Sequence, residues 1–280
     1  MCGIWYLTSK RQLCYNEVLK SAIQINNRGQ NGWGTLIDYE TFFRYKKSMP
    51  LKGEGDRVSI EPLSFPNHKE IRTWIYNNRY GTVGGDKFKN FPPQIFVGES
   101  NVTKGNICGN DMLFTFLNGE FKVDDQRKEL ENLGFAVRAT TDTAVIGGYV
   151  QRFLLDGADL LNAVVMTLES ISGAYGVIFF RNHEAVIARD VFGTRPLYLF
   201  ISDLGNRICA ASESQCFKPL DPFYLDNFMT DHPYSAGWRP FIPGEVIRIK
   251  DHEIVESYLM KKEDLKWDKS SLNTILRQNA

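Results

Sequence analysis

The sequence lacks the features that mark secreted, membrane-spanning and nucleic-acid-binding proteins. Its 280 residues contain no apolar run as long as a membrane span. The N-terminus has no basic region followed by an apolar one, which a secretory signal requires. Lys plus Arg and Asp plus Glu each number 33, and this balance argues against a dedicated binder of nucleic acid or of a membrane surface. We therefore predict a cytoplasmic protein with no nucleic-acid or membrane partner.

Cysteine is also scarce, and its arrangement argues against two of its usual roles. The five cysteines are an odd number and no two have the Cys-x-x-Cys spacing, so the sequence indicates neither a disulfide framework nor a metal site of the zinc type. We expect four of them to be small residues of the core: Cys14, Cys108, Cys209 and Cys216. Cys2 differs from these because it directly follows the initiator methionine.

The position of Cys2 allows a specific chemistry. Cys2 and Gly3 are small, so an aminopeptidase can remove Met1 and leave Cys2 with both a thiol and a free α-amino group. An α-amine titrates at about 7.7–8.0 and a thiol near about 8.5, so the amine can accept the thiol proton near neutral pH, directly or through a water. This is the N-terminal form of an activated nucleophile. A small second residue is common, however, so the interpretation depends on the motifs that follow.

The spacing of apolar residues predicts strands, then helices, then strands again. The expected helices span 15–25, 70–75, 125–133, 143–155 and 158–170. The expected strands span 2–7, 34–37, 41–45, 112–117, 174–180, 185–188, 197–201, 207–211, 246–249 and 254–258. This order favours an α+β fold in which two antiparallel sheets pack together with helices outside, a four-layer α/β/β/α sandwich. A generic α+β fold is the alternative.

Several short motifs follow Cys2 along the chain. They are Asn27-Arg28-Gly29-Gln30-Asn31-Gly32, Asn78-Arg79-Tyr80-Gly81-Thr82-Val83-Gly84, Leu117-Asn118-Gly119-Glu120, Thr141-Asp142-Thr143, Gly173-Ala174-Tyr175, Ala188-Arg189-Asp190, Gly193-Thr194-Arg195-Pro196-Leu197-Tyr198, Ala211-Ser212-Glu213 and Pro243-Gly244-Glu245. None is specific alone. The ordered set, starting at Cys2, resembles the glutaminase domain of class II glutamine amidotransferases. The resemblance implies the sandwich of the N-terminal nucleophile hydrolases, with this domain over residues 2–258 and a C-terminal tail over 259–280.

By this resemblance the catalytic residues are Cys2, Asn118 and Gly119. The side-chain amide of Asn118 and the backbone N–H of Gly119 would bind the oxygen of a tetrahedral intermediate. The alternative is a hairpin turn, which Asn-Gly often forms where a strand ends.

The resemblance assigns glutamine binding to five residues. Arg79 would hold the α-carboxylate, because a guanidinium binds a carboxylate through two parallel hydrogen bonds. Thr82 and Val83 would form the adjoining edge of the glutamine pocket. Glu120 and Asp142 would pair with the α-ammonium group, and Asp142 is alternatively, or in addition, the N-cap of a helix.

Other parts of the pocket are implied in the same way. Arg28 and Gly29 would shape the Cys2 pocket without joining the chemistry. The glycine-rich segment 80–90 would be a lid that closes over substrate. Asn31 and Leu117 depart from the residues common in the family, aspartate and histidine respectively, and they leave the shape of the pocket and the identity of the amide open.

We expect the chain to hydrolyse glutamine to glutamate and ammonia through a Cys2 thioester, with no metal and no organic cofactor. The sequence after residue 258 carries no motif of an acceptor-binding half. We therefore expect either a free-standing glutaminase subunit, with a separate synthase subunit as the partner that receives the ammonia, or an excised domain of a longer protein. Two alternatives stay open. One is an N-terminal cysteine hydrolase that acts on another amide. The other is a catalytically idle, glutamine-binding regulatory subunit.

Overall fold

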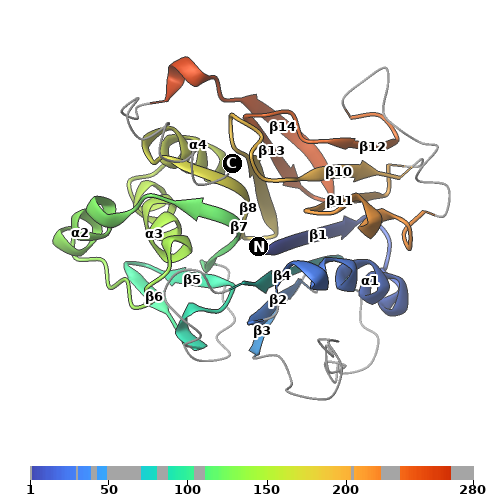
Figure 1. Ribbon diagram of the computed structural model, residues 1–280, viewed down its shortest axis with the longest axis horizontal. Coiled ribbons are helices and arrows are strands. Elements are labelled where there is room, and N and C mark those ends of the chain that lie inside the picture. Colours follow the sequence, from blue (N-terminus) through green and yellow to red (C-terminus); the bar gives the residue numbers. More distant parts are fainter. Residues whose placement is uncertain are drawn as a thin grey trace.

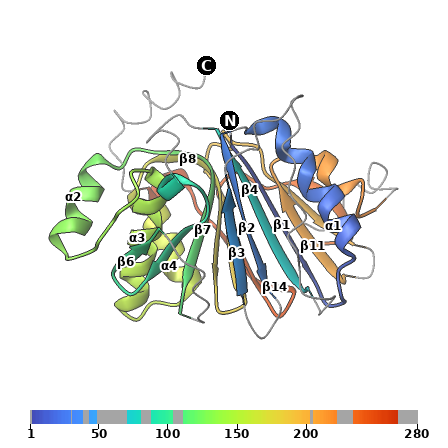
Figure 2. The same cartoon turned by 90° about the horizontal axis from the view of Figure 1, so that it is seen from below.

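Two antiparallel sheets pack face to face at the centre of the molecule, with helices outside them (Figures 1 and 2). The structure, a computed structural model, describes residues 2–29, 31–38, 43–48, 71–80, 88–103, 111–202, 205–221 and 234–265. The predicted α/β/β/α sandwich of antiparallel sheets is confirmed.

The first sheet carries the start of the chain at its centre. Its strand order is β12-β10-β11-β1-β4-β2-β3. The bounds are β1 Gly3–Ser9, β2 Gly32–Asp38, β3 Phe43–Ser48, β4 Thr73–Arg79, β10 Tyr198–Ile201, β11 Arg207–Ala211 and β12 Gly237–Pro240. Strand β1 pairs with β4 on one side and with β11 on the other. Cys2 therefore precedes a strand that is hydrogen-bonded along both of its edges.

The second sheet has the order β14-β13-β9-β8-β7-β5-β6. Its bounds are β5 Gln94–Val97, β6 Ser100–Val102, β7 Leu113–Phe121, β8 Gly173–Arg181, β9 Glu184–Arg189, β13 Glu245–Lys250 and β14 Glu253–Leu259. The turn between β13 and β14, at Asp251 and His252, has two successive residues with positive φ, as the tight turn of a twisted hairpin requires. The predicted strands 246–249 and 254–258 are confirmed as β13 and β14, which pair with each other.

The helices lie on the outer faces of the two sheets (Figure 2). Their bounds are α1 Tyr15–Ala22, α2 Asp124–Asn132, α3 Asp142–Leu155 and α4 Leu160–Ser170, and the 3-10 helices are η1 Ile23–Arg28, η2 Phe88–Asn90, η3 Ser214–Phe217 and η4 Lys262–Asp264. Helix α1 covers the first sheet, whereas α3 and α4 cover the second. Of the helices in the described part of the chain, none combines the length and the apolar composition that crossing a membrane demands.

Three apolar layers separate the four layers of secondary structure. Ile4, Phe116 and Leu199 lie in the layer between the sheets. Trp5 lies in the layer under α1, and Val177 in the layer under α3 and α4. Successive residues of a strand point to opposite faces, so Ile4 and Trp5 reach different layers. The strands are therefore buried on both faces, and their sequences are apolar runs rather than alternations.

Three sequence predictions about local structure are wrong. The described part of the predicted helix 70–75 is not helical, because Thr73–Arg79 is strand β4, which lies between β1 and β2. Asn118 and Gly119 do not form a turn: β7 continues through them to Phe121 and stays paired with β8. Cys14 is exposed, while Cys209 and Cys216 are buried as expected and Cys108 lies outside the described residues. Strands β5, β6 and β12 have no counterpart among the predicted elements.

Candidate active site

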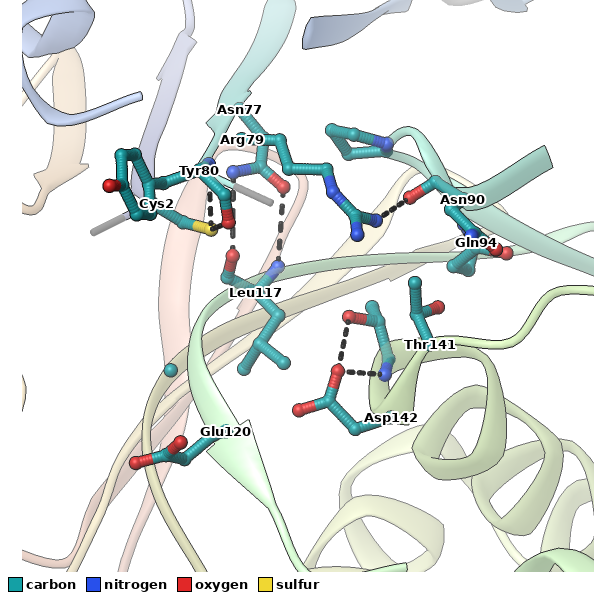
Figure 3. A pocket seen from close by; sticks show the side chains of 13 residues that line it. Cys2, Asn77, Arg79, Tyr80, Asn90, Gln94, Leu117, Glu120, Thr141 and Asp142 are labelled. Carbon is teal, nitrogen blue, oxygen red and sulfur yellow. Dashed lines mark hydrogen bonds between the residues drawn. The ribbon is translucent and has the colours of Figure 1, made fainter. Parts of the chain in front are cut away.

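Cys2 lies immediately before β1, at the end of the first sheet. The backbone N–H of Tyr80 donates a hydrogen bond to Cys2 Sγ over 3.4 Å (Figure 3). Tyr80 follows the last residue of β4, the strand that pairs with β1, so the sheet register places it beside Cys2. The thiol is half-buried and faces a pocket.

Burial raises the pKa of the Cys2 thiol above its ordinary value. The hydrogen bond from Tyr80 lowers this pKa, the negative charge of Asp142 raises it, and the positive charge of Arg79 lowers it, but burial is the largest effect. The thiol is thus protonated near neutral pH, and a nucleophile in this state needs a base to accept its proton.

The Arg28 side chain binds the main chain of Cys2. Its Nε donates to the Cys2 carbonyl oxygen over 2.9 Å, and its Nη1 donates to Glu213, which follows β11 by two residues. The Arg28 side chain is 8% exposed, so this ion pair is screened less by water than a surface pair. The structure places Arg28 where the sequence predicts a pocket-shaping residue.

Gly29 packs directly against Arg79. A Cβ atom on Gly29 would lie 2.6 Å from the carbonyl carbon of Arg79 and 2.9 Å from its nitrogen, so any side chain here would displace the end of β4. The backbone N–H of Asn31 donates to the Arg79 carbonyl oxygen over 2.9 Å and fixes the same segment. The Arg-Gly stretch therefore supports both Cys2 and Arg79.

Arg79 is the last residue of β4 and is 7% exposed. Its Nη1 donates to the backbone carbonyl of Asn90 (Figure 3). The Asn90 side chain in turn accepts from Thr140 N over 2.9 Å and donates to Thr140 Oγ1 over 2.9 Å. This chain of contacts ties the guanidinium to the segment that enters α3, so its position is set by three parts of the chain.

Asp142 is the first residue of α3. Its Oδ1 accepts from the backbone N–H of Thr143 over 2.8 Å, and its Oδ2 accepts from that of Phe121 over 3.0 Å. Burial raises the pKa of the Asp142 carboxyl, although both hydrogen bonds and the charge of Arg79 lower it. The alternative role predicted for it, the helix N-cap, belongs instead to Thr141, whose side chain accepts from Ala144 N.

Glu120 has a partner of its own. Its carboxylate lies 3.2 Å from Arg195 Nη2, and its side chain is 41% exposed. Glu120 lines the pocket, but it stands apart from Arg79 and Asp142 (Figure 3).

Asn118 and Gly119 are neighbours in β7 and face opposite sides of the sheet. Gly119 lines the pocket, where a Cβ atom would lie 2.2 Å from the carbonyl oxygen of Ala174, so only glycine fits. Asn118 is 1% exposed, and its Nδ2 donates to Ser212 Oγ over 3.2 Å. Its side chain therefore contacts the first sheet and is not among the pocket-lining groups.

One pocket gathers five of the ten predicted site residues. Its volume is about 490 Å³, open solvent at its mouth included. Of the predicted residues, Cys2, Arg79, Gly119, Glu120 and Asp142 line it. Arg28 and Gly29 do not line the pocket but contact two residues that do, Cys2 and Arg79 respectively. Thr82, Val83 and most of the predicted lid lie outside the described residues.

The pocket also contains residues to which the sequence assigns no binding role. These are Asn77, Tyr80, Asn90, Pro92, Gln94, Leu117, Thr141 and Thr143. Asn77 donates to the Gly3 carbonyl oxygen over 2.7 Å and so joins β4 to β1. Recognising β4 as a strand would have placed Asn77 on the face of Arg79, since residues two apart share a face. Asn90 and Gln94 flank Pro92 and Pro93, and the sequence marks this stretch only as a loop.

Comparisons with known proteins find similar chains. A family model described as a glutamine amidotransferase domain matches residues 107–219. The amidophosphoribosyltransferase of Methanocaldococcus jannaschii is 28% identical over 264 residues, which are 92% of this chain and 49% of the relative. The amidophosphoribosyltransferase of Bacillus subtilis is 26% identical over 255 residues, which cover 89% of this chain and 45% of the relative.

A second group of relatives makes another product. The glutamine–fructose-6-phosphate aminotransferase of Sulfurisphaera tokodaii is 25% identical over 262 residues, 90% of this chain and 39% of the relative. Among solved structures, glutamine phosphoribosylpyrophosphate amidotransferase from B. subtilis, in complex with ADP and GMP, has the same fold. Its TM-score is 0.67 at 22% identity, over 92% of this chain and 49% of that chain.

Residues 107–219 match a glutamine amidotransferase domain, and most of the chain is similar to class II glutamine amidotransferases and shares the fold of their solved structures. The chain spans about half the length of the amidophosphoribosyltransferases that it matches.

Proposed function

We propose that this chain hydrolyses glutamine to glutamate and ammonia. The observation that carries the proposal is that Cys2, Arg79 and Asp142 line one pocket. These residues supply a thiol, a buried cation and a partly buried anion. Such groups can bind and hydrolyse a free amino acid that has a side-chain amide. The first attacks the amide, and the other two pair with the α-carboxylate and the α-ammonium group.

Substrate binding follows from the charges in the pocket. Arg79 binds the α-carboxylate through its planar guanidinium, and Asp142 accepts hydrogen bonds from the α-ammonium. Glu120, which is paired with Arg195, adds a second, weaker negative charge. Thr82 and Val83, which lie outside the described residues, are proposed as further substrate-binding residues. An amide that lacks the α-amine leaves the negative charge of Asp142 without a positive partner from the substrate, which makes binding of that amide unfavourable.

The reaction then runs through a thioester. After removal of Met1, the Cys2 amine takes the thiol proton and the sulfur attacks the side-chain carbonyl carbon of glutamine. Asn118 Nδ2 and the Gly119 N–H stabilise the tetrahedral oxyanion. The C–N bond breaks, the protonated amine supplies the proton that completes ammonia, and a γ-glutamyl thioester remains. A water, activated by the same amine, attacks the thioester to release glutamate and restore the thiol.

The proposed domain spans residues 2–258, with 259–280 as a tail. Support comes from β14, which ends at Leu259 and is the edge strand of the second sheet. The ammonia passes to a separate synthase subunit, because ammonia released into water near neutral pH is mostly protonated and no longer nucleophilic. The cysteine nucleophile needs neither a metal nor an organic cofactor for this hydrolysis.

The test is turnover by the mature chain. We expect glutamate and ammonia in equal amounts from glutamine, little or no product from asparagine, and none from the Cys2→Ala variant. Calorimetry with glutamine on Cys2→Ala should still show binding, since Arg79 and Asp142 remain. Binding without turnover by the wild-type chain, alone and with candidate synthases, would identify a regulatory subunit. Faster turnover of another amide would identify a different hydrolase.

A further inference from the structure

Ser212 lies one residue beyond β11 and is fully buried. Its backbone N–H donates to the Ile4 carbonyl oxygen over 2.9 Å, and its Oγ accepts from the Ile4 N–H over 3.0 Å. The last regular pair of β1 and β11 is Trp5 with Ala211. Ser212 therefore extends the pairing by one residue toward Cys2, and it uses its side chain as the acceptor.

The same hydroxyl oxygen accepts a second hydrogen bond from the other sheet. Asn118 Nδ2, on β7, donates to Ser212 Oγ over 3.2 Å, and Asn118 is 1% exposed. A serine hydroxyl has two acceptor lone pairs. Ile4 and Asn118 both donate to this oxygen. The Ser212 hydroxyl therefore links the strand that follows Cys2 to the side chain of Asn118.

This contact determines how the Asn118 amide is oriented. A primary amide has two N–H groups. One of those on Asn118 is directed to Ser212, which fixes the nitrogen end of the side chain. Asn118 lies two residues after Phe116 and so faces the layer between the sheets, which also contains Ile4, two residues after Cys2. An oxyanion donor works only when it is aimed at the oxygen before the reaction begins. The Ser212 hydroxyl links Asn118 to the strand that follows Cys2, because it also accepts a hydrogen bond from Ile4.

We propose that Ser212 is a positioning residue that aims the second N–H of Asn118 at the oxyanion. This rests on the proposed hydrolysis through Cys2. The adjacent Glu213 holds Arg28, which holds the Cys2 carbonyl, so two consecutive residues after β11 fix the nucleophile and the oxyanion donor relative to each other. Ser212 does not touch substrate and acts only through Asn118.

The first test compares Ser212→Ala with a matched buried serine. Ser21 is also fully buried, and its hydroxyl accepts from Trp5 Nε1 over 2.9 Å on the opposite face of β1, remote from Asn118. We expect Ser212→Ala to lower kcat about 10- to 100-fold with KM for glutamine within about threefold, since a misplaced group costs up to about 10²-fold. Ser21→Ala should lower thermal stability but leave kcat near wild type. Equal kcat in Ser212→Ala and wild type would overturn the proposal.

The second test uses two reagents that label Cys2. In 6-diazo-5-oxo-L-norleucine a diazoketone replaces the carboxamide, and its carbonyl oxygen occupies the oxyanion position while the thiol forms a thioether and N₂ leaves. Iodoacetamide alkylates the thiol without that carbonyl. Ser212→Ala should slow the diazoketone about as much as it lowers kcat and leave iodoacetamide unchanged. Equal slowing of both would show that Ser212 supports the nucleophile, and would overturn the proposal. A wild-type chain that reacts with iodoacetamide alone would instead refute the proposed function.

A double-mutant cycle separates positioning from a general loss of structure. If Ser212 acts only through Asn118, Ser212→Ala has no further effect on kcat in the Asn118→Ala background. Multiplied losses in the double variant would overturn the proposal. Ser212→Cys keeps a side chain of similar size with a weak acceptor, and it gives the same readout if Ser212→Ala does not fold.

Discussion

Gly29 lies against the main chain of Arg79 so closely that a Cβ atom would sit 2.6 Å from the Arg79 carbonyl carbon. The backbone cannot yield there, because Arg79 is held by the pairing of β4 with β2. Gly29, the residue that follows η1, thus fixes the position of the Arg79 main chain beside the pocket.

We therefore expect Gly29→Ala to lower both stability and activity. Overpacking of this kind costs about 1–3 kcal/mol, and the displacement of Arg79 should raise KM for glutamine. Gly176→Ala is the matched control, because its Cβ would meet Ile4 and Leu197 at 3.6 Å, an ordinary contact distance. Thermal unfolding and glutamine kinetics on both variants measure the difference. Equal melting temperatures for the two variants would contradict the packing argument.

Arg79→Lys tests the carboxylate contact. Lysine keeps the charge but loses the planar pair of donors, so kcat/KM for glutamine should fall about 10- to 100-fold, in line with a lost hydrogen bond to a charged group. The decarboxylated analogue, 4-aminobutanamide, has no group for Arg79 to bind, and its lower kcat/KM should change little. Equal losses for both amides would mean that Arg79 only supports the fold.

Two charges near Cys2 should shift its titration in opposite directions. Asp142 raises the pKa of the Cys2 thiol and Arg79 lowers it. Asp142→Asn removes a negative charge, so the thiolate forms at lower pH. Arg79→Gln removes a positive charge, so the thiolate forms at higher pH. The pH dependence of Cys2 alkylation by iodoacetamide, followed by peptide mass spectrometry, measures both shifts, with the exposed Cys14 as a reference for the reagent. Shifts of the same sign would refute this electrostatic account.

The overall fold could be predicted from the sequence because most strands are short apolar runs between clear turns. Strand β11 matches its predicted span, residues 207–211, and β8 differs from its prediction by one residue at each end. Strand β4 was not predictable in this way. Its sequence contains the buried Asn77 and Asn78, whose side-chain amides donate hydrogen bonds to Gly3 and Ile25, far away in the chain. Tertiary hydrogen bonds of this kind leave no local signal.

The site, like the fold, has residues that the sequence identifies and contacts that it does not. The ordered motifs identify Cys2, Arg79 and Asp142, and the fold brings all three to one pocket. The Asn118-Gly119 pair has the composition of a turn, but pairing with β8 keeps it extended, since Gly119 fits against Ala174 where no side chain could. The contact of Asn118 with Ser212 joins residues 94 positions apart, so it becomes visible only when the two sheets are packed.

The central claim is that Cys2 forms a covalent intermediate with glutamine. Mature protein should be mixed with glutamine, quenched in acid within the first turnovers and analysed by intact and peptide mass spectrometry. We predict a chain that begins at Cys2 and carries a γ-glutamyl group on the Cys2 sulfur, removable by neutral hydroxylamine and absent with asparagine. Turnover of glutamine by protein that retains Met1, or with no adduct on Cys2 under any quench, would contradict the account.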